Sequence, residues 1–310
     1  MDVLTLQKWA YIDAVPSYNA TAYGLLHHYS GISAADIDSH LLRIRKLAWD
    51  VSRQPFIGRW RFLQLAEPLD PYYQQVLFRL TLPKSKDCIL DIGCGFGQAL
   101  RQLRADGVAG SKLFGADIES RFISLGYDLF RDKDTLGATF VSGDLLDPDD
   151  ERLDMLAGRF TMVHADSFFH LMSWTEQLYA AKRLIVWLRK DTNNGFIYGK
   201  HAGTIHPAEV ALAGSRPYLH NRQSFQRLWD EAGEMTNTKW RVEVERTCFD
   251  FPGTPGHLGH CGAPPNLPPL ELLLAVSHPH IGARIATSAN DNHDIAHSRA
   301  PSWKPAVALQ

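Results

Sequence analysis

The architecture follows from residues 89–98, ILDIGCGFGQ. In this stretch an apolar run ends at an acid, turns through three alternate glycines and continues into a helical pattern. Glycine permits a tight turn and lets a ligand approach the backbone closely, and the start of the following helix offers free N–H groups. The spacing is G-x-G-x-G and not G-x-G-x-x-G, which disfavours a nicotinamide-dependent reductase. On its own, the turn does not separate a ligand site from a structural turn.

Strand and helix patterns alternate around and after this turn. Short apolar runs predict strands at 88–92, 113–117, 139–142, 160–164, 196–199 and 239–245. Apolar residues at helical spacing predict helices over 98–106, 122–130, 175–188 and 224–232. Strands that alternate with helices of this length form a parallel, doubly wound sheet. We therefore expect an α/β, Rossmann-like, mostly parallel core over residues 86–249.

The segments on either side of this core differ from it in composition. Residues 1–85 are rich in aromatic side chains and predict helices at 20–29, 37–51, 59–66 and 71–80, which would form a helical cap. The aromatic residues of the cap would either pack in a core or line a pocket for an apolar substrate. Residues 250–310 are rich in proline and histidine and show no periodicity apart from LELLLAV, which predicts a mostly disordered tail.

Composition excludes several classes of protein. The chain has 32 Lys+Arg and 34 Asp+Glu, a net charge of −2, which argues against electrostatic capture of nucleic acid. No signal peptide and no apolar run of about 18 residues is present, so we expect a cytoplasmic protein without a membrane span. The cluster His257-x-x-His260-Cys261 lacks a second ligand pair, so no metal site is expected. A reduced compartment is expected because four cysteines are too few for a disulfide framework: Cys88, Cys94, Cys248 and Cys261.

Two further strands end at acids. Asp117 ends the second strand, twenty residues after Gly97, where a carboxylate can accept hydrogen bonds from both hydroxyls of a ribose. The alternative is that Asp117 caps the helix that begins near Ser120. Asp144 ends the third strand, where its carboxylate can accept from an adenine amino group and the Leu145 N–H can donate to a ring nitrogen. The alternative there is a surface turn acid in the acidic run 144–150.

The fourth strand leads into an aromatic loop. In MVHADSFFHLMSW, residues 162–174, His170 is the candidate for a residue near the reacting centre. The alternative is a histidine with a purely structural role, which is common for a lone histidine after an apolar run.

These four elements, in this order, resemble the class I S-adenosylmethionine-dependent methyltransferases. The resemblance covers about residues 15–246. Within this class, the chain is similar to methyltransferases of fungal meroterpenoid (polyketide–terpenoid) biosynthesis. The runs GYDLFRD (126–132) and SFFHLMSW (167–174) are particular to that group. It implies S-adenosyl-L-methionine as cofactor and a carboxyl group of a prenylated aromatic polyketide as methyl acceptor. The residues implied are Asp91, Gly93, Gly95 and Gly97 beside the methionine moiety, Asp117 and Ile118 at the ribose, and Asp144 and Leu145 at the adenine.

The acceptor decides whether a base is needed. A carboxylate, with a pKa near ~4, is ionised at pH 7, whereas a phenol, with a pKa near ~10, needs a base. The candidate bases are His170, His164 and His201. The acceptor pocket should lie over the strand ends, roofed by cap aromatics and by loops 164–174 and 200–220, the latter with Tyr218. The candidates to bind an acceptor carboxylate are Arg222, Arg53, Arg59 and Arg61.

The C-terminal part departs from the resemblance. Similar proteins close their sheet with a final antiparallel strand, and none is recognisable after Arg246. Either a changed reading frame or retained intron, or a pathway-specific extension, would explain this. A non-catalytic S-adenosylmethionine-binding regulator is therefore kept as an alternative, beside a phenolic O-methyltransferase. The sequence does not name the acceptor or the oligomeric state.

Overall fold

The centre of the protein is a seven-stranded sheet. The computed structural model describes residues 10–18, 20–191, 194–211, 215–247 and 271–277, all of which fall in one compact unit, Met1–His280. The strand order is β3-β2-β1-β4-β5-β9-β8, in which β1 to β5 pair in parallel. These strands are β1 (Ile89–Ile92), β2 (Leu113–Asp117), β3 (Thr139–Ser142), β4 (Met162–His164) and β5 (Phe196–Ala202). The expected Rossmann-like, mostly parallel sheet is confirmed.

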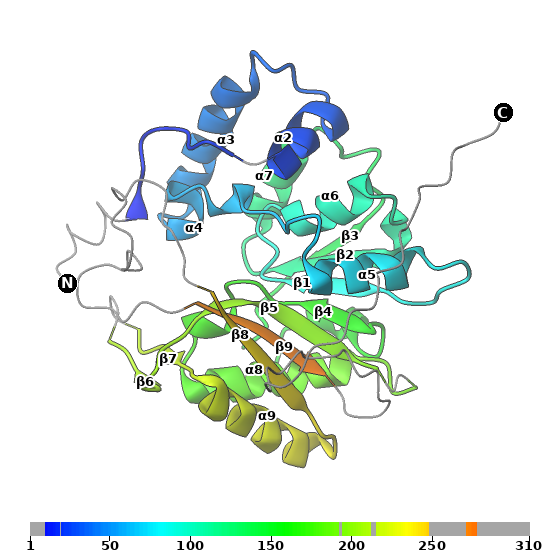
Figure 1. Ribbon diagram of the computed structural model, residues 1–310, viewed down its shortest axis with the longest axis vertical. Helices are drawn as coiled ribbons and strands as arrows, with labels where there is room; N and C mark the ends of the chain where they lie inside the picture. The colour runs from blue at the N-terminus through cyan, green and yellow to red at the C-terminus, as the bar shows by residue number, and fades with distance from the viewer. Residues whose placement is uncertain (1–9, 19, 192–193, 212–214, 248–270, 278–310) are drawn as a thin grey trace, which may run out of the picture. The chain divides into compact units, whose positions relative to one another are not determined.

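Helices cover the sheet on both faces. Figure 1 shows α6 (Gln98–Ala105) and α7 (Ser120–Phe130) on one side, and α8 (Trp174–Trp187) and α9 (Arg222–Thr236) on the other. Every residue of β1 and β2 is buried between these layers, which explains why both strands are apolar except for Asp91 and Asp117. Helix α8 begins where Ser173 and Glu176 form a capping box, so its start is set by local sequence.

The last strands of the sheet correct an expectation. β8 (Arg241–Thr247) is at the edge, and β9 (Glu271–Ser277) lies between β5 and β8, antiparallel to both. The final antiparallel strand that was not recognisable in the sequence after Arg246 is therefore present, and residues 271–277, ELLLAVS, form it. The physical reason is that β9 finds its hydrogen-bond partners in strands distant in sequence, which no local pattern reveals. The rest of the tail, including the His257–Cys261 cluster, lies outside the described residues.

The cap is built from short helices packed together. They are α2 (Ala20–Gly24), the π-helix η1 (Leu25–Tyr29), α3 (Ile37–Val51), α4 (Pro55–Gly58), the 3₁₀ turn η2 (Arg61–Leu63) and α5 (Pro71–Thr81). The expected helix over 59–66 is wrong, because Trp60 adopts a left-handed conformation with φ of 59° and limits the helix to one turn. Apolar cap residues share one core with Phe96 of the glycine turn and Phe122 of α7. The division into 1–85, 86–249 and 250–310 stays a prediction.

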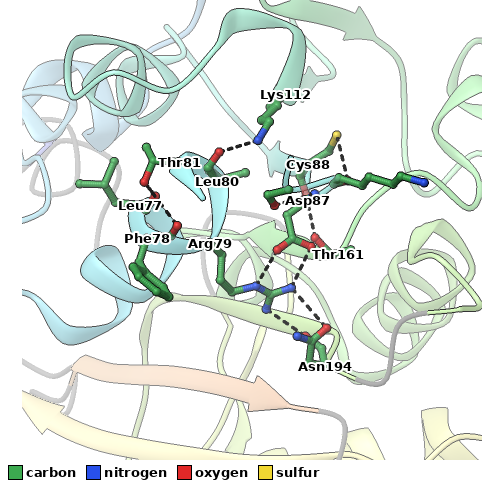
Figure 2. Close-up of polar contacts among 12 residues, drawn as sticks. Leu77, Phe78, Arg79, Leu80, Thr81, Asp87, Cys88, Lys112, Thr161 and Asn194 are labelled. Carbon is green, nitrogen blue, oxygen red and sulfur yellow. Dashed lines mark hydrogen bonds and ion pairs between the residues drawn. The ribbon is translucent and has the colours of Figure 1, made fainter. Parts of the chain in front are cut away.

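Helix α5 is fastened to the edge of the sheet at which the strands begin. Figure 2 shows Arg79 of α5 between Asp87, which precedes β1, and Asn194, which precedes β5. The Arg79 Nε lies 3.1 Å from Asp87 Oδ2, and Nη1 donates to the Asn194 carbonyl at 3.0 Å. This network fixes the amino ends of the central strands, whereas ligand sites in open α/β sheets lie at the carboxyl ends. Among the described helices, none is both long and apolar enough to cross a membrane.

Two short strands between β5 and α9 form a second sheet. β6 (Ala208–Glu209) and β7 (Tyr218–Leu219) pair with each other and form a small separate sheet. The Tyr218 N–H donates to the Met172 carbonyl, and Gln177 of α8 donates to the Tyr218 carbonyl. These bonds direct the segment after β5 toward α8.

Candidate functional site

A cavity of about 470 Å³ lies where the parallel strands end. Each of the strands β1 to β5 contributes to it, either at its last residues or in the turn that follows. The lining residues from these strand ends include Asp91, Gly93, Gly95, Gln98, Asp117, Ile118, Asp144, Leu145, His164, Asp166, Phe168 and Lys200. Every residue predicted to bind the cofactor lines this cavity except Gly97, which is the N-cap of α6.

The glycine turn has a conformation that requires glycine. Gly93 and Gly95 have φ of 68° and 55°, in the left-handed region. A Cβ on Gly95 would lie 2.7 Å from the Phe56 ring, and one on Gly93 would lie 3.0 Å from the Phe168 ring. Backbone N–H groups of Gly93 and Cys94 donate to the Ala116 carbonyl, which ties the turn to β2. Side chains at these positions would fill the cradle between the turn and the aromatic rings.

The Asp117 carboxylate is fixed beside the glycine turn by two backbone N–H groups. Its Oδ2 accepts from Gly95 N at 2.8 Å, and its Oδ1 accepts from Glu119 N at 2.9 Å. Burial raises the pKa of Asp117, while the two N–H donors oppose that shift. The alternative role as helix cap is excluded, because the side chain that caps α7 is that of Glu119. Each oxygen of Asp117 keeps a second lone pair, so the carboxylate can still accept hydrogen bonds from two hydroxyls.

Asp144 and Leu145 form a turn that is fixed by its neighbours. Asp144 Oδ1 accepts from Leu146 N at 2.9 Å, and Asp144 N donates to Asp150 Oδ2 at 2.7 Å. Asp150 is in turn paired with Arg152 at 2.6 Å. The turn therefore presents a carboxylate and backbone groups to the cavity in a defined position.

The set of polar groups fits S-adenosyl-L-methionine. Two carboxylates at successive strand ends can accept from ribose hydroxyls and from an adenine amino group. In addition, the side-chain oxygen of Gln98 is buried without a hydrogen-bond partner among the described residues, although this side chain lines the cavity. An acceptor of this kind suits the ammonium group of an amino acid moiety. The assignment of each residue to the methionine, ribose or adenine moiety stays a prediction.

The three candidate histidines have different positions. His164 lines the cavity, and its Nδ1 lies 2.8 Å from Asp91 Oδ1; burial works to lower the pKa of His164, but Asp91 outweighs it and raises that pKa. His170 and His201 are not among the described residues that line the cavity. His170 accepts from Ala202 N, and burial lowers the pKa of His170 to about 4. His201 is buried beside Phe169, and burial lowers its pKa well below the usual value.

Of the four candidate arginines, Arg61 alone lines the cavity. The turn that carries it depends on Trp60, whose ring is covered by the Arg45 guanidinium at 4.0 Å and whose Nε1 donates to the Ile12 carbonyl. Tyr218 and Arg222 do not line the cavity, because their segment packs toward α8.

Sequence reasoning missed some lining residues. Lys200, two residues before the end of β5, is a second cation in the cavity, and its position after an apolar run was the signal that could have indicated it. Among the cap aromatics, Phe56, Tyr72 and Tyr73 line the cavity, while Trp60 and Phe62 are buried in the cap core. Both readings of the cap aromatics therefore apply, each to different residues.

The chain is similar in sequence to two known protein families and to several known proteins. Residues 10–63 match the meroterpenoid methyltransferase N-terminal domain, and residues 89–191 match a methyltransferase domain. The chain is 36% identical over 222 residues to O-methyltransferase phiE of Fungal sp., a match that covers 71% of this chain and 73% of that protein. It is 31% identical over 227 residues to the Asnovolin E/Chermesin D methyltransferase nvfJ of Aspergillus novofumigatus, covering 73% and 80% of the two chains. Among solved structures, it is similar to a Burkholderia thailandensis 1,6-didemethyltoxoflavin-N1-methyltransferase with bound 1,6-didemethyltoxoflavin and S-adenosylhomocysteine, with a TM-score of 0.48, 14% identity, and coverage of 86% and 97%.

Proposed function

The chain belongs to the fungal meroterpenoid methyltransferases, and from this premise we propose that it methylates a carboxylate of an apolar, prenylated aromatic polyketide. It is an S-adenosyl-L-methionine-dependent O-methyltransferase of secondary metabolism. What the family does not fix is the acceptor, and the proposal concerns that group.

The observation that carries the proposal is the pair of cations in the cavity. Arg61 enters from the cap and Lys200 from β5, and among the lining residues these are the two with permanent positive charge. A guanidinium binds a carboxylate with two parallel hydrogen bonds, and an ammonium adds a point charge. Aromatic and apolar side chains line the same cavity and would contact the rest of an apolar acid: Phe56, Tyr72, Phe168, Leu171 and Met172.

In this proposal the residues of the chain position the cofactor and the acceptor, and none of them transfers a proton. S-adenosyl-L-methionine, when bound, supplies an electrophilic methyl group. Asp117 and Asp144 would hold that cofactor, and Arg61 and Lys200 would orient the acceptor oxygen toward it. A carboxylate with a pKa near ~4 is already ionised at pH 7, so no base is required. Alignment of reacting atoms accounts for several kcal/mol of rate acceleration (upper range about 7–11).

Replacing Arg61 tests the proposal. With an aryl acid as acceptor, Arg61→Gln should raise KM about 10-fold or more, because a charge-assisted hydrogen bond contributes ~1.5–3 kcal/mol. Binding of S-adenosylhomocysteine, measured by calorimetry, should stay unchanged. The matched control is Arg53→Gln, an exposed arginine eight residues earlier that does not line the cavity. Equal KM values for the two variants would contradict the role given to Arg61.

A second candidate function is methylation of a phenol, and the pair His164–Asp91 favours it. If Nδ1–H of neutral His164 donates to Asp91, the Nε2 atom remains to take a proton, as in other histidine–carboxylate pairs. Mass spectrometry with matched aryl acids and phenols distinguishes the two acceptors. A rate that rises with pH through the pKa of His164, and is lost in His164→Gln, would favour the phenol. Cofactor bound with neither acceptor methylated would favour the non-catalytic regulator.

A further inference from the structure

We propose that Arg101, Asp132 and Tyr29 form a buried positioning network through which the N-terminal cap fixes the cofactor-binding glycine turn. Arg101 lies on α6, Asp132 lies after α7, and Tyr29 is the last residue of η1. The proposal concerns binding of S-adenosyl-L-methionine and is independent of which acceptor the enzyme uses.

Arg101 and Asp132 are a buried, two-pronged ion pair. Arg101 Nε lies 2.8 Å from Asp132 Oδ2, and Nη2 lies 2.9 Å from Oδ1. The Arg101 side chain has no exposed surface, and the Asp132 side chain is 3% exposed. Aromatic rings of Phe130 and Tyr127 lie over the guanidinium at 4.8 and 5.2 Å. A buried pair of this kind contributes little net stability, because desolvation opposes the attraction, but its geometry is strictly defined.

The remaining nitrogen of Arg101 holds the glycine turn. Nη1 donates to the Phe96 carbonyl at 2.6 Å and contacts the Gly97 carbonyl at 3.4 Å. A Cβ on Gly97 would lie 2.7 Å from this same Nη1. Gly97 does not line the cavity. Its φ of 64° favours glycine, and a Cβ there would meet the Phe140 ring at 2.8 Å as well as the Arg101 guanidinium. The guanidinium therefore sets the orientation of the two peptide groups at the end of the turn. The other two glycines of this turn, Gly93 and Gly95, line the cavity.

The cap reaches the network through Tyr29. The Tyr29 hydroxyl donates to Asp132 Oδ2 at 2.8 Å, the same oxygen that binds Arg101 Nε. Burial and the Asp132 carboxylate raise the pKa of Tyr29, so the hydroxyl remains a donor. Phe96, whose carbonyl is held by Arg101, packs in the core of the cap against Phe56 and Phe62. The cap is thus linked to the turn in two ways, directly through the packing of Phe96 and indirectly from the Tyr29 hydroxyl through Asp132 and Arg101.

The test is the affinity of the full-length protein for S-adenosylhomocysteine, measured by calorimetry. Tyr29→Phe should raise the Kd for S-adenosylhomocysteine about 5- to 10-fold. Arg101→Lys keeps the positive charge but loses the planar set of N–H donors, so it should raise this Kd further. The matched control is Tyr18→Phe, because the Tyr18 hydroxyl also donates to a carboxylate, that of Asp38, but entirely within the cap. Tyr18→Phe should leave Kd unchanged. If Arg101→Lys does not fold, Tyr29→Phe decides the question alone.

Hydrogen exchange gives a second readout, which a merely structural role would not change. Coupling between two sites is reciprocal, so bound S-adenosylhomocysteine should slow amide exchange in residues 25–29 of the unmodified protein. This protection should shrink in Tyr29→Phe and persist in Tyr18→Phe. A Tyr29→Phe protein with lower melting temperature but unchanged Kd, or with full protection of residues 25–29, would overturn the proposal.

Discussion

At the scale of residues, the site is a set of side chains whose backbone partners fix their direction. Asp117 is the clearest case, since two N–H groups hold its carboxylate and leave one lone pair on each oxygen. His170 is the opposite case. It was the catalytic candidate of the sequence, yet its ring accepts from Ala202 N outside the described cavity lining, and burial lowers its pKa to about 4. A direct role for His170 stays a prediction that the geometry does not support.

Asp117→Ala should weaken cofactor binding by at least about 10-fold. The change removes charge-assisted hydrogen bonds, each of which contributes ~1.5–3 kcal/mol, and also frees the Gly95 N–H that the carboxylate holds. Calorimetry with S-adenosylhomocysteine measures the effect. Asp128→Ala, at an exposed acid on α7, should bind like the unmodified protein. An unchanged affinity of Asp117→Ala would refute the ribose assignment.

At the scale of elements, β9 determines how the sheet is completed. It lies between β5 and β8, pairs with both along seven residues, and so satisfies the backbone groups of β5 on that side. A changed reading frame or retained intron and a pathway-specific extension were both considered because the sequence shows no recognisable final strand. Because that strand is present, residues 271–277 belong to the sheet that carries the site.

Leu274→Pro should lower the free energy of unfolding by about 2–3 kcal/mol. Leu274 is opposite Gly199 on one side and Val244 on the other, so a proline there removes a ladder hydrogen bond in the interior of the sheet. Leu274→Ala keeps the backbone N–H and is the comparison. Urea unfolding should show a clearly lower midpoint for the proline variant than for the alanine variant. Equal midpoints would mean that β9 contributes nothing to the stability of the sheet.

At the scale of the whole molecule, buried neutral histidines make stability depend on pH. His201 and His220 both pack against Phe225, and the His170 ring packs against His201. Burial lowers the pKa of each of the three, to about 4 for His170 and about 3 for His220. In the unfolded chain a histidine binds its proton near ~6.5. Below that pH the unfolded state holds more protons than the folded state, so acidification favours unfolding.

The free energy of unfolding should therefore fall as pH decreases from 7 toward 5. The slope contributed by one fully shifted histidine is up to about 1.4 kcal/mol per pH unit. Urea unfolding at pH 7, 6 and 5 measures it. His220→Gln should flatten the slope, while His28→Gln, at an exposed histidine outside this group, should leave it unchanged. A slope that is the same in all three proteins would show that His220 does not contribute.

Local sequence patterns were sufficient for the elements of the parallel core. The runs at 113–117 and 139–142 coincide with β2 and β3. Asp117, which ends β2, and Asp144, in the turn after β3, line one cavity, because parallel strands bring their carboxyl ends to one edge. The glycine turn was equally predictable, since only glycine adopts its left-handed conformation readily. These features are typical of class I methyltransferases and so indicate the cofactor before any coordinates. The narrower family was implied by the resemblance of the runs GYDLFRD and SFFHLMSW, and the positions at which the cofactor binds stay a prediction.

Contacts between distant segments decided the rest. Whether Arg61 or Arg222 enters the cavity depends on the left-handed turn at Trp60 and on the packing of Tyr218 toward α8. The position of β9 depends on pairing with strands far away in the chain. The surroundings of Gly97 include Arg101 and Phe140, and the Arg101 guanidinium is linked to the turn, to Asp132 after α7 and, through Asp132, to Tyr29 of the cap. Such choices are set by the direction of side chains in three dimensions, which spacing along one chain does not encode.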